Sequence, residues 1–245
     1  MRKIILSAAL FCAASLNLAA FEMDHKTFNS KTIKGSDELK GLNDFDSGHY
    51  KTIINMSNMP AGVKFTVLND RAAIGSLGQQ TVDTFAREDL TTVTSPTGEK
   101  IPCFVVSGKG FLPGERVTLK FQAEDGSVST VNVQPYPLYD RNYKGDAFIF
   151  AELKDIKPVS YELVGKGLKD GEELEFITTA GKAKETFKVK YEAGKPMVYL
   201  PNIKKGRSGN SHLIIKRENG ETFDLYLPWG IQLTKFIKGK IKPGV

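Results

Sequence analysis

Histidine, cysteine and carboxylate side chains carry most acid–base, nucleophilic and metal chemistry in proteins, and in this sequence they are few and scattered. The histidines are His25, His49 and His212, and no His-Glu-x-x-His, Cys-x-x-Cys, Gly-x-Ser-x-Gly, Walker or Ser-x-x-Lys motif occurs. His212 alternates with Leu213 and Ile214 where a strand is expected to start. This pattern favours a structural or surface histidine over a metal ligand.

Two pairs of neighbouring carboxylates have the residue types needed for the acid–base work of a glycosidase. Glu172 and Glu173 are expected in a strand, where successive side chains point to opposite faces, so they cannot face one substrate. Glu124 and Asp125 border an expected turn. The sequence therefore predicts no catalytic residue, no cofactor-binding residue and no metal ligand, and it favours a protein that is not an enzyme. A hydrolase with an unrecognised site is the least favoured alternative.

Basic residues are the better candidates for function. In residues 182–191, lysines of one parity, including Lys184, Lys188 and Lys190, alternate with apolar and aromatic residues. This alternation predicts a strand with a lysine-rich face. Such a face could bind an anionic partner, or it could keep an edge strand from pairing with other chains. Both interpretations stay open.

Two further groups complete the candidate partner-binding residues. Lys204, Lys205 and Arg207 lie in an expected glycine-containing loop, where backbone amides could join the cations around a phosphate or carboxylate. Tyr139 and Arg141 lie in an expected link between modules and are of residue types enriched at interfaces. A solvated loop and packing between the modules are the respective alternatives.

The chain carries a mild positive charge. Its formal net charge is +6, and loss of Arg2 and Lys3 with a leader peptide would leave +4. This charge fits an anionic partner, but it is also common in exported proteins without one, and it argues against nucleic acid. Residues 231–245 add lysines without any acidic residue, which suits contact with an anionic membrane or polymer or completion of the last sheet.

The first twenty residues have the pattern of a secretory signal peptide. Arg2 and Lys3 precede an apolar run at residues 4–16, and small residues end at Ala20. The run is shorter than the ~20 residues that a membrane-spanning helix needs, so we expect cleavage after Ala20 and no transmembrane span in the mature chain. The expected location is the periplasm, the cell surface or the medium.

Cys103 is the cysteine that stays when Cys12 departs with the leader, so the mature chain is expected to form no internal disulfide. It lies in the apolar run 101–106, which predicts a buried small hydrophobic residue rather than a reactive thiol. The fold is then expected to rest on its hydrophobic cores alone.

From Tyr50 onward, short alternating runs separated by Gly, Pro, Asn and Asp predict strands and tight turns. Asp125 and Gly126 predict a hairpin turn between strands at residues 117–123 and 128–133.

A second hairpin is expected between residues 211–217 and 222–228. The Asn-Gly pair between these two runs suits a two-residue type I′ turn. In the register that such a turn imposes, Ile214 faces Leu225, and His212 faces Leu227.

The most specific internal signal is a repeat. Residues 108–119 (Gly-Lys-Gly-Phe-Leu-Pro-Gly-Glu-Arg-Val-Thr-Leu) recur at residues 165–176 (Gly-Lys-Gly-Leu-Lys-Asp-Gly-Glu-Glu-Leu-Glu-Phe), and residues 58–67 are a weaker copy. In each copy a strand ends, a Pro-Gly, Asp-Gly or Ala-Gly turn reverses the chain, and an alternating strand follows. The sequence therefore predicts a reused strand–turn–strand element.

In architecture, residues 50–230 resemble the Ig-like and fibronectin type III-like modules of bacterial exported and surface proteins. The resemblance rests on the Gly-Phe-Leu-Pro-Gly-Glu element that ends at Glu115 and on its copy at residues 167–172. The fold class that it implies is all-β, with two consecutive antiparallel β-sandwich modules after the signal peptide. Such modules usually serve adhesion, spacing or ligand binding, and no family-specific binding residue carries over.

The expected organisation has six segments: a signal peptide (1–20), a flexible polar arm (21–48), a first β-sandwich module (49–135), a linker (136–145), a second module (146–230) and a basic tail (231–245). The predicted function is that of an exported, non-enzymatic envelope or surface protein that binds or adheres to a macromolecular partner. That partner is expected to be an envelope protein or an anionic polymer or lipid surface, without nucleic acid or a cofactor. A structural or assembly subunit of an envelope complex is the alternative.

Overall fold

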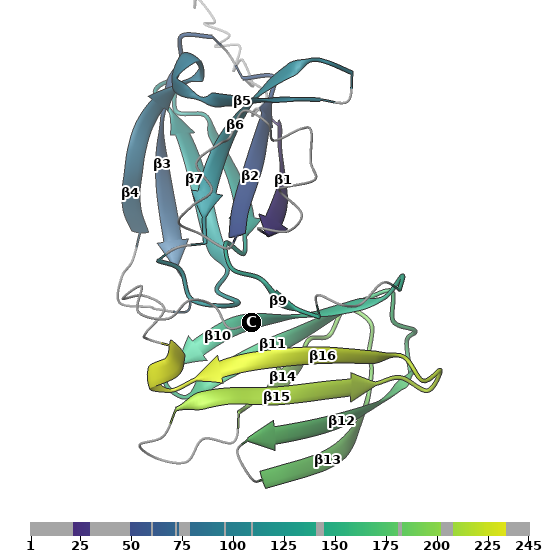
Figure 1. Cartoon of the computed structure of the whole chain (residues 1–245). Helices are drawn as coiled ribbons and strands as arrows, with labels where there is room; N and C mark the ends of the chain where they lie inside the picture. Colours follow the sequence, from purple (N-terminus) through teal and green to yellow (C-terminus); the bar gives the residue numbers. More distant parts are fainter. Residues whose placement is uncertain are drawn as a thin grey trace, which may run out of the picture.

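The computed structural model describes most of the chain beyond residue 21. The described residues are 22–29, 50–59, 61–71, 73, 79–95, 97–108, 110–140, 145–180, 183–201 and 208–233. Within them the chain folds into four antiparallel four-stranded sheets (Figure 1). The predicted all-β class with antiparallel sandwich modules is confirmed.

Sheets A and B form the first sandwich. In spatial order, sheet A holds β1 (Glu22–Asn29), β2 (Tyr50–Ser57), β6 (Lys100–Ser107) and β5 (Thr91–Thr94). Sheet B holds β4 (Gln79–Ala86), β3 (Lys64–Arg71), β7 (Val117–Ala123) and β8 (Val128–Val133), and the 3-10 helix η3 (Arg87–Asp89) follows β4. Consecutive strand pairs alternate between the two sheets, which is the strand order of Ig-like sandwiches.

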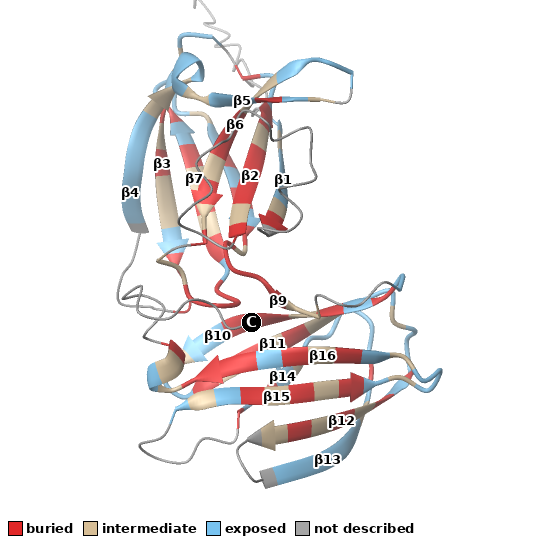
Figure 2. Cartoon of the chain, viewed as in Figure 1, coloured by how far each residue is buried: buried red, intermediate tan, exposed pale blue. Residues whose placement is uncertain are grey.

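The core of the first sandwich lies between sheets A and B, where apolar side chains of both meet. Figure 2 colours the buried residues of these strands red. Phe121 of β7 contacts Phe65 of β3 and Phe104 of β6, with ring centroids 5.8 and 5.5 Å apart. The Phe121–Phe104 contact links the two sheets, and each such aromatic pair adds about 1 kcal/mol beyond the burial of its area.

Sheet A also has an apolar cluster on its outward face, formed by Phe28, Ile53, Val93 and Cys103. Cys103 is 1% exposed, and burial raises the pKa of its thiol to about 11. The thiolate, which is the nucleophilic form, is therefore disfavoured at neutral pH. The predicted burial of this cysteine is confirmed.

Sheets C and D form the second sandwich. In spatial order, sheet C holds β14 (Met197–Tyr199), β11 (Val159–Lys166), β10 (Phe148–Ile156) and β9 (Leu138–Tyr139). Sheet D holds β13 (Ala183–Lys190), β12 (Glu173–Ala180), β15 (Gly209–Lys216) and β16 (Thr222–Trp229). Sheet D repeats the strand order of sheet B. The second module differs in its additional edge strand β9 and in the single strand β14, which takes the place of the β5 and β6 pair.

The second core is closed by a buried hydrogen bond. The hydroxyl of Tyr161 on β11 donates to the carbonyl oxygen of Pro228 on β16 at 2.6 Å, and Phe176 and Phe223 lie in the same cluster. Burial raises the pKa of Tyr161 well above its ordinary value, so the hydroxyl stays protonated and keeps this bond between the sheets.

Each copy of the sequence repeat crosses from one sheet of a sandwich to the other, so the predicted strand–turn–strand element is confirmed. We call residues 110–116, between β6 and β7, the junction loop, and residues 167–172, between β11 and β12, the end loop. In the junction loop the Glu115 carboxylate accepts hydrogen bonds from the Leu112 amide at 2.8 Å and from Nε and Nη2 of Arg71, both at 2.7 Å.

The end loop repeats this pattern atom for atom. The Glu172 carboxylate accepts from the Lys169 amide at 3.1 Å and from Nε and Nη2 of Arg217 at 2.7 and 3.0 Å. Arg71 lies 44 residues before Glu115, whereas Arg217 lies 45 residues after Glu172. The arginine that binds the loop glutamate therefore comes before the loop in the first module and after the loop in the second.

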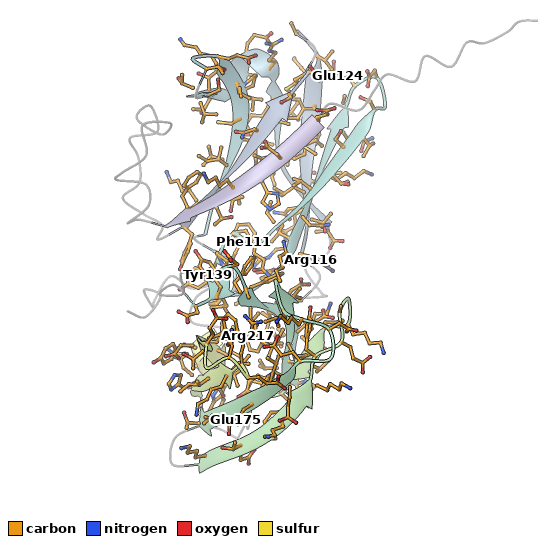
Figure 3. All side chains as sticks on the ribbon, turned by 90° about the vertical axis from the view of Figure 1, so that its right-hand side faces the viewer. Phe111, Arg116, Glu124, Tyr139, Glu175 and Arg217 are labelled. Atoms are coloured by element: carbon orange, nitrogen blue, oxygen red, sulfur yellow. The ribbon has the colours of Figure 1, made fainter. Side chains whose placement is uncertain are left out.

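The junction loop also contacts the second module. The Leu153 amide on β10 donates to the Gly114 carbonyl at 2.8 Å, and Arg116 Nε lies 3.3 Å from Glu152 Oε1. Leu112 is 1% exposed and belongs to the same apolar cluster as the strands of sheet C. The two modules therefore share part of one core, and Figure 3 shows Phe111 and Arg116 where they meet.

The predicted register of the last hairpin is wrong by one residue. In the structure Leu213 pairs with Leu225 and His212 with Tyr226. The loop has three residues rather than two: Arg217 N–H donates to Glu221 O at 2.8 Å, and Gly220 alone of the turn has a positive φ, of 88°. A type I turn closed by a left-handed glycine adds one residue to the loop and shifts every pair.

Three predicted segment boundaries differ from the structure. Residues 22–29 of the predicted arm form β1, which pairs with β2 along its full length. Leu138 and Tyr139 of the predicted linker form β9, and Leu233 of the predicted tail is 1% exposed in the second core. In each case a short segment pairs at a sheet edge or packs in a core. The polar residues that flank it in the sequence did not indicate this. The predicted signal peptide lies outside the described residues.

Candidate partner-binding surfaces

Sheet D presents one face to the core and the other to solvent. Core-side residues such as Leu174, Phe176 and Leu213 are buried. The residues of opposite parity, which we call the outer face of sheet D, are Glu173, Glu175, Ile177 and Thr179 of β12, Lys184, Thr186, Lys188 and Lys190 of β13, His212, Ile214 and Lys216 of β15, and Thr222, Asp224 and Tyr226 of β16. None of these residues is buried.

The three candidate lysines of β13 lie on this outer face, so the predicted alternation is confirmed. Lys188 Nζ lies 2.5 Å from Glu173 Oε1, and that hydrogen bond raises the pKa of Lys188. Neither Lys184 nor Lys190 forms an ion pair with a residue that the structure describes. Two cations at the free edge of the sheet are therefore available to a partner.

On the half of the sheet away from β13, on β15 and the opposite edge strand β16, the outer face carries an aromatic pair that the sequence did not reveal. The rings of His212 and Tyr226 stack with centroids 4.5 Å apart and an interplanar angle of 1°, and Tyr226 is 58% exposed. His212 Nε2 also contacts Asp224 Oδ1. The carboxylate orients the imidazole ring, and the exposed ring of Tyr226 offers a flat apolar surface with a polar tip.

The error in register explains why this pair was missed. The two-residue turn placed His212 opposite Leu227, whereas the three-residue loop places it opposite Tyr226. The positive φ of Gly220 is the local feature that decides between the two loops.

The remaining candidates do not join this face. Tyr139 pairs with Phe150 on the outward face of sheet C, and Figure 3 shows it near the junction of the modules, whereas Glu175 lies farther from the junction. Arg141, Lys204, Lys205 and Arg207 lie outside the described residues.

Two further findings concern the residues that the structure describes. No three histidine, cysteine, aspartate or glutamate side chains among them gather to hold a metal ion. In that same part of the chain, no helix is both long enough and apolar enough to cross a membrane.

Comparisons with known proteins give likenesses among solved structures. No family model and no curated protein matches the chain. Among solved structures, it is similar to a tetra-tandem repeat in the extending region of a large adhesion protein, with a TM-score of 0.25 and 9% identity. The match covers 86% of this chain and 49% of that chain, so this chain spans about half the length of the solved repeat segment.

Proposed function

We propose that the protein is an exported, non-enzymatic binding or adhesion module of the cell envelope or surface. Its partner is an anionic macromolecule, and the contact region is the outer face of sheet D. The observation that carries this proposal is the pair of exposed lysines without an ion-pair partner among the described residues, Lys184 and Lys190, on one face with the exposed Tyr226. The leader-like pattern of residues 1–20 supports export.

The charge of this face suits an anionic partner for a physical reason. Lys188 and Lys216 are matched by Glu173 and Glu175, so the excess positive charge lies at Lys184 and Lys190. Each cation near an anionic surface contributes about 1 kcal/mol at low ionic strength, and salt screens this attraction over about 10 Å.

The test is retention of the full chain on anionic envelope preparations at several ionic strengths. Replacing Lys184, Lys188 and Lys190 with serine should weaken retention about tenfold or more at low salt, and less at high salt. The matched control replaces the exposed Lys26, Lys64 and Lys100 of the first module with serine, which gives the same loss of charge. Equal effects of the two triple variants would reject the outer face of sheet D as the contact region.

The shared core of the two modules favours a second candidate function, a structural or assembly subunit. A Gly114–Leu153 hydrogen bond and a buried Leu112 hold the modules together, as a spacer requires. Light scattering separates the two functions. Stable oligomers without any envelope material would favour the assembly role, and a monomer retained on anionic material would favour the binding role.

A further inference from the structure

β13 is a long, regular strand at the edge of sheet D. It has eight residues and pairs with β12 over all of them without a register shift. Within the part of the chain that the structure describes, β13 pairs with β12 alone, and the other eight-residue edge strands differ: the pairing of β4 with β3 is interrupted between Val67 and Leu68, β1 lies beside β8, and β16 lies beside β9. Edge strands that are straight and uncovered are templates for pairing with another chain.

The free backbone groups of β13 can be assigned from its pairing. Tyr191 N–H donates to Glu172 O at 2.8 Å, so the backbone of Tyr191 points toward β12. Because backbone groups alternate in direction along a strand, the N–H and C=O groups of residues 184, 186, 188 and 190 point to the free side. An incoming strand would meet these four pairs of donors and acceptors.

The side chains of β13 select what can pair there. On the core side, Phe187 stacks on Phe176 at 5.2 Å yet stays 42% exposed, so an apolar side chain on an incoming strand would cover it. On the outer side stand Lys184, Lys188 and Lys190. An acidic side chain at the alternate positions of an incoming strand would lie beside these cations.

A second copy of β13 does not meet these requirements. Two copies of β13 paired in antiparallel fashion would place lysines opposite lysines on one face, which is destabilising. We propose that β13 accepts an extended segment of a partner polypeptide in which acidic and apolar residues alternate, adding a fifth strand to sheet D. This inference rests on the proposed function and specifies its partner.

The test uses the full chain and a fluorescein-labelled peptide, as long as β13, in which Glu and Val alternate. Thr186→Pro removes a free N–H without touching the pairing with β12, and edge strands tolerate proline there. Thr186→Ala is the matched control, because it keeps the N–H. Fluorescence anisotropy should show binding by the parent chain and by Thr186→Ala, and at least about tenfold weaker binding by Thr186→Pro. Equal binding by the two variants overturns the proposal.

Charge reversal gives a second test that does not depend on proline. Lys184→Glu combined with Lys190→Glu should switch the preference to a peptide in which Lys and Val alternate. Binding of both peptides without preference overturns the proposal. If the parent chain binds no peptide but retention on envelope preparations still depends on the lysines of β13, this inference fails and the proposed function stands, with an anionic polysaccharide or lipid as partner.

Discussion

The junction loop and the end loop have similar backbone conformations, but the junction loop packs against the other module and the end loop is exposed to solvent. In both, a glycine with positive φ, Gly114 at 74° or Gly171 at 79°, precedes the glutamate that an arginine holds. The residues just before differ. Leu112 and Pro113 are buried, Leu112 in the apolar cluster of the second module, whereas the equivalent Lys169 and Asp170 are exposed.

This difference separates two roles within one loop. The glycine and the Glu–Arg pair set the shape of the crossover, and the two residues before the glycine decide whether the loop packs against a neighbour. The weaker copy supports the separation, because Asn58 and Gly62 also have positive φ while Val63 stands where the other copies have glutamate. The turn thus forms without a glutamate at this position, and here the Gly62 amide donates to Glu88 Oε1 at 3.2 Å.

Glu115→Ala is expected to have the largest effect on stability. It should lower the free energy of unfolding by about 4 kcal/mol, because the buried Arg71 loses its carboxylate partner. Glu172→Ala should cost about 2 kcal/mol, because Arg217 keeps its ion pair with Glu221. Urea unfolding of the two variants measures the difference. Equal losses would show that the two pairs stabilise the protein alike.

Gly114→Ala is expected to cost about 3 kcal/mol and Gly171→Ala about 1 kcal/mol. Both substitutions place alanine at positive φ, but only at Gly114 would the new Cβ lie 2.9 Å from Ala151 O. At Gly171 the nearest atom is Lys190 Cε at 3.5 Å, the end of a flexible side chain. Thermal unfolding of both variants tests this pair, and a larger loss at Gly171 would contradict the assigned contact between the modules.

The pH dependence of the end loop should give the smallest effect. The Arg217 guanidinium lowers the pKa of Glu172, so the ionised carboxylate stabilises the fold above its ordinary pKa of 4.5, and this contribution is lost as pH falls through the lowered value. Glu172→Gln lacks this contribution. The gap in unfolding free energy between parent and variant should therefore stay constant, at roughly 1–2 kcal/mol, from pH 7 to about pH 5 and shrink below pH 4.5.

Urea midpoints at each pH measure this gap. Acidic groups present in both proteins, such as Asp125, cancel in the difference. A gap that widens toward low pH would contradict the assigned ion pair.

Local patterns in the sequence predicted the features that depend on neighbouring residues. The parity of residues 182–191 predicted which side of β13 carries lysines, and the apolar run around Cys103 predicted its burial. The repeat predicted a reused strand–turn–strand element, because its glycines and turn residues are local. Each of these needs only the alternation of a strand or the chemistry of a turn.

Long-range pairing and loop length could not be predicted in the same way. Arg71 and Glu115 are 44 residues apart, and nothing near either residue indicates the other. The Asn-Gly signal before Glu221 is compatible with a two- or three-residue loop, so the register and the His212–Tyr226 stack were missed. The pairing of β1 depends on a partner strand that starts at Tyr50, beyond a long intervening segment.

Amide hydrogen exchange of the full chain, with and without anionic envelope polymer, tests the account most directly. We expect exchange to slow along β13 when the polymer is present, while the junction loop, already buried between the modules, shows no change. Slower exchange confined to the first module, or no change in β13 at any ionic strength, would contradict the central claim that sheet D carries the partner-binding surface.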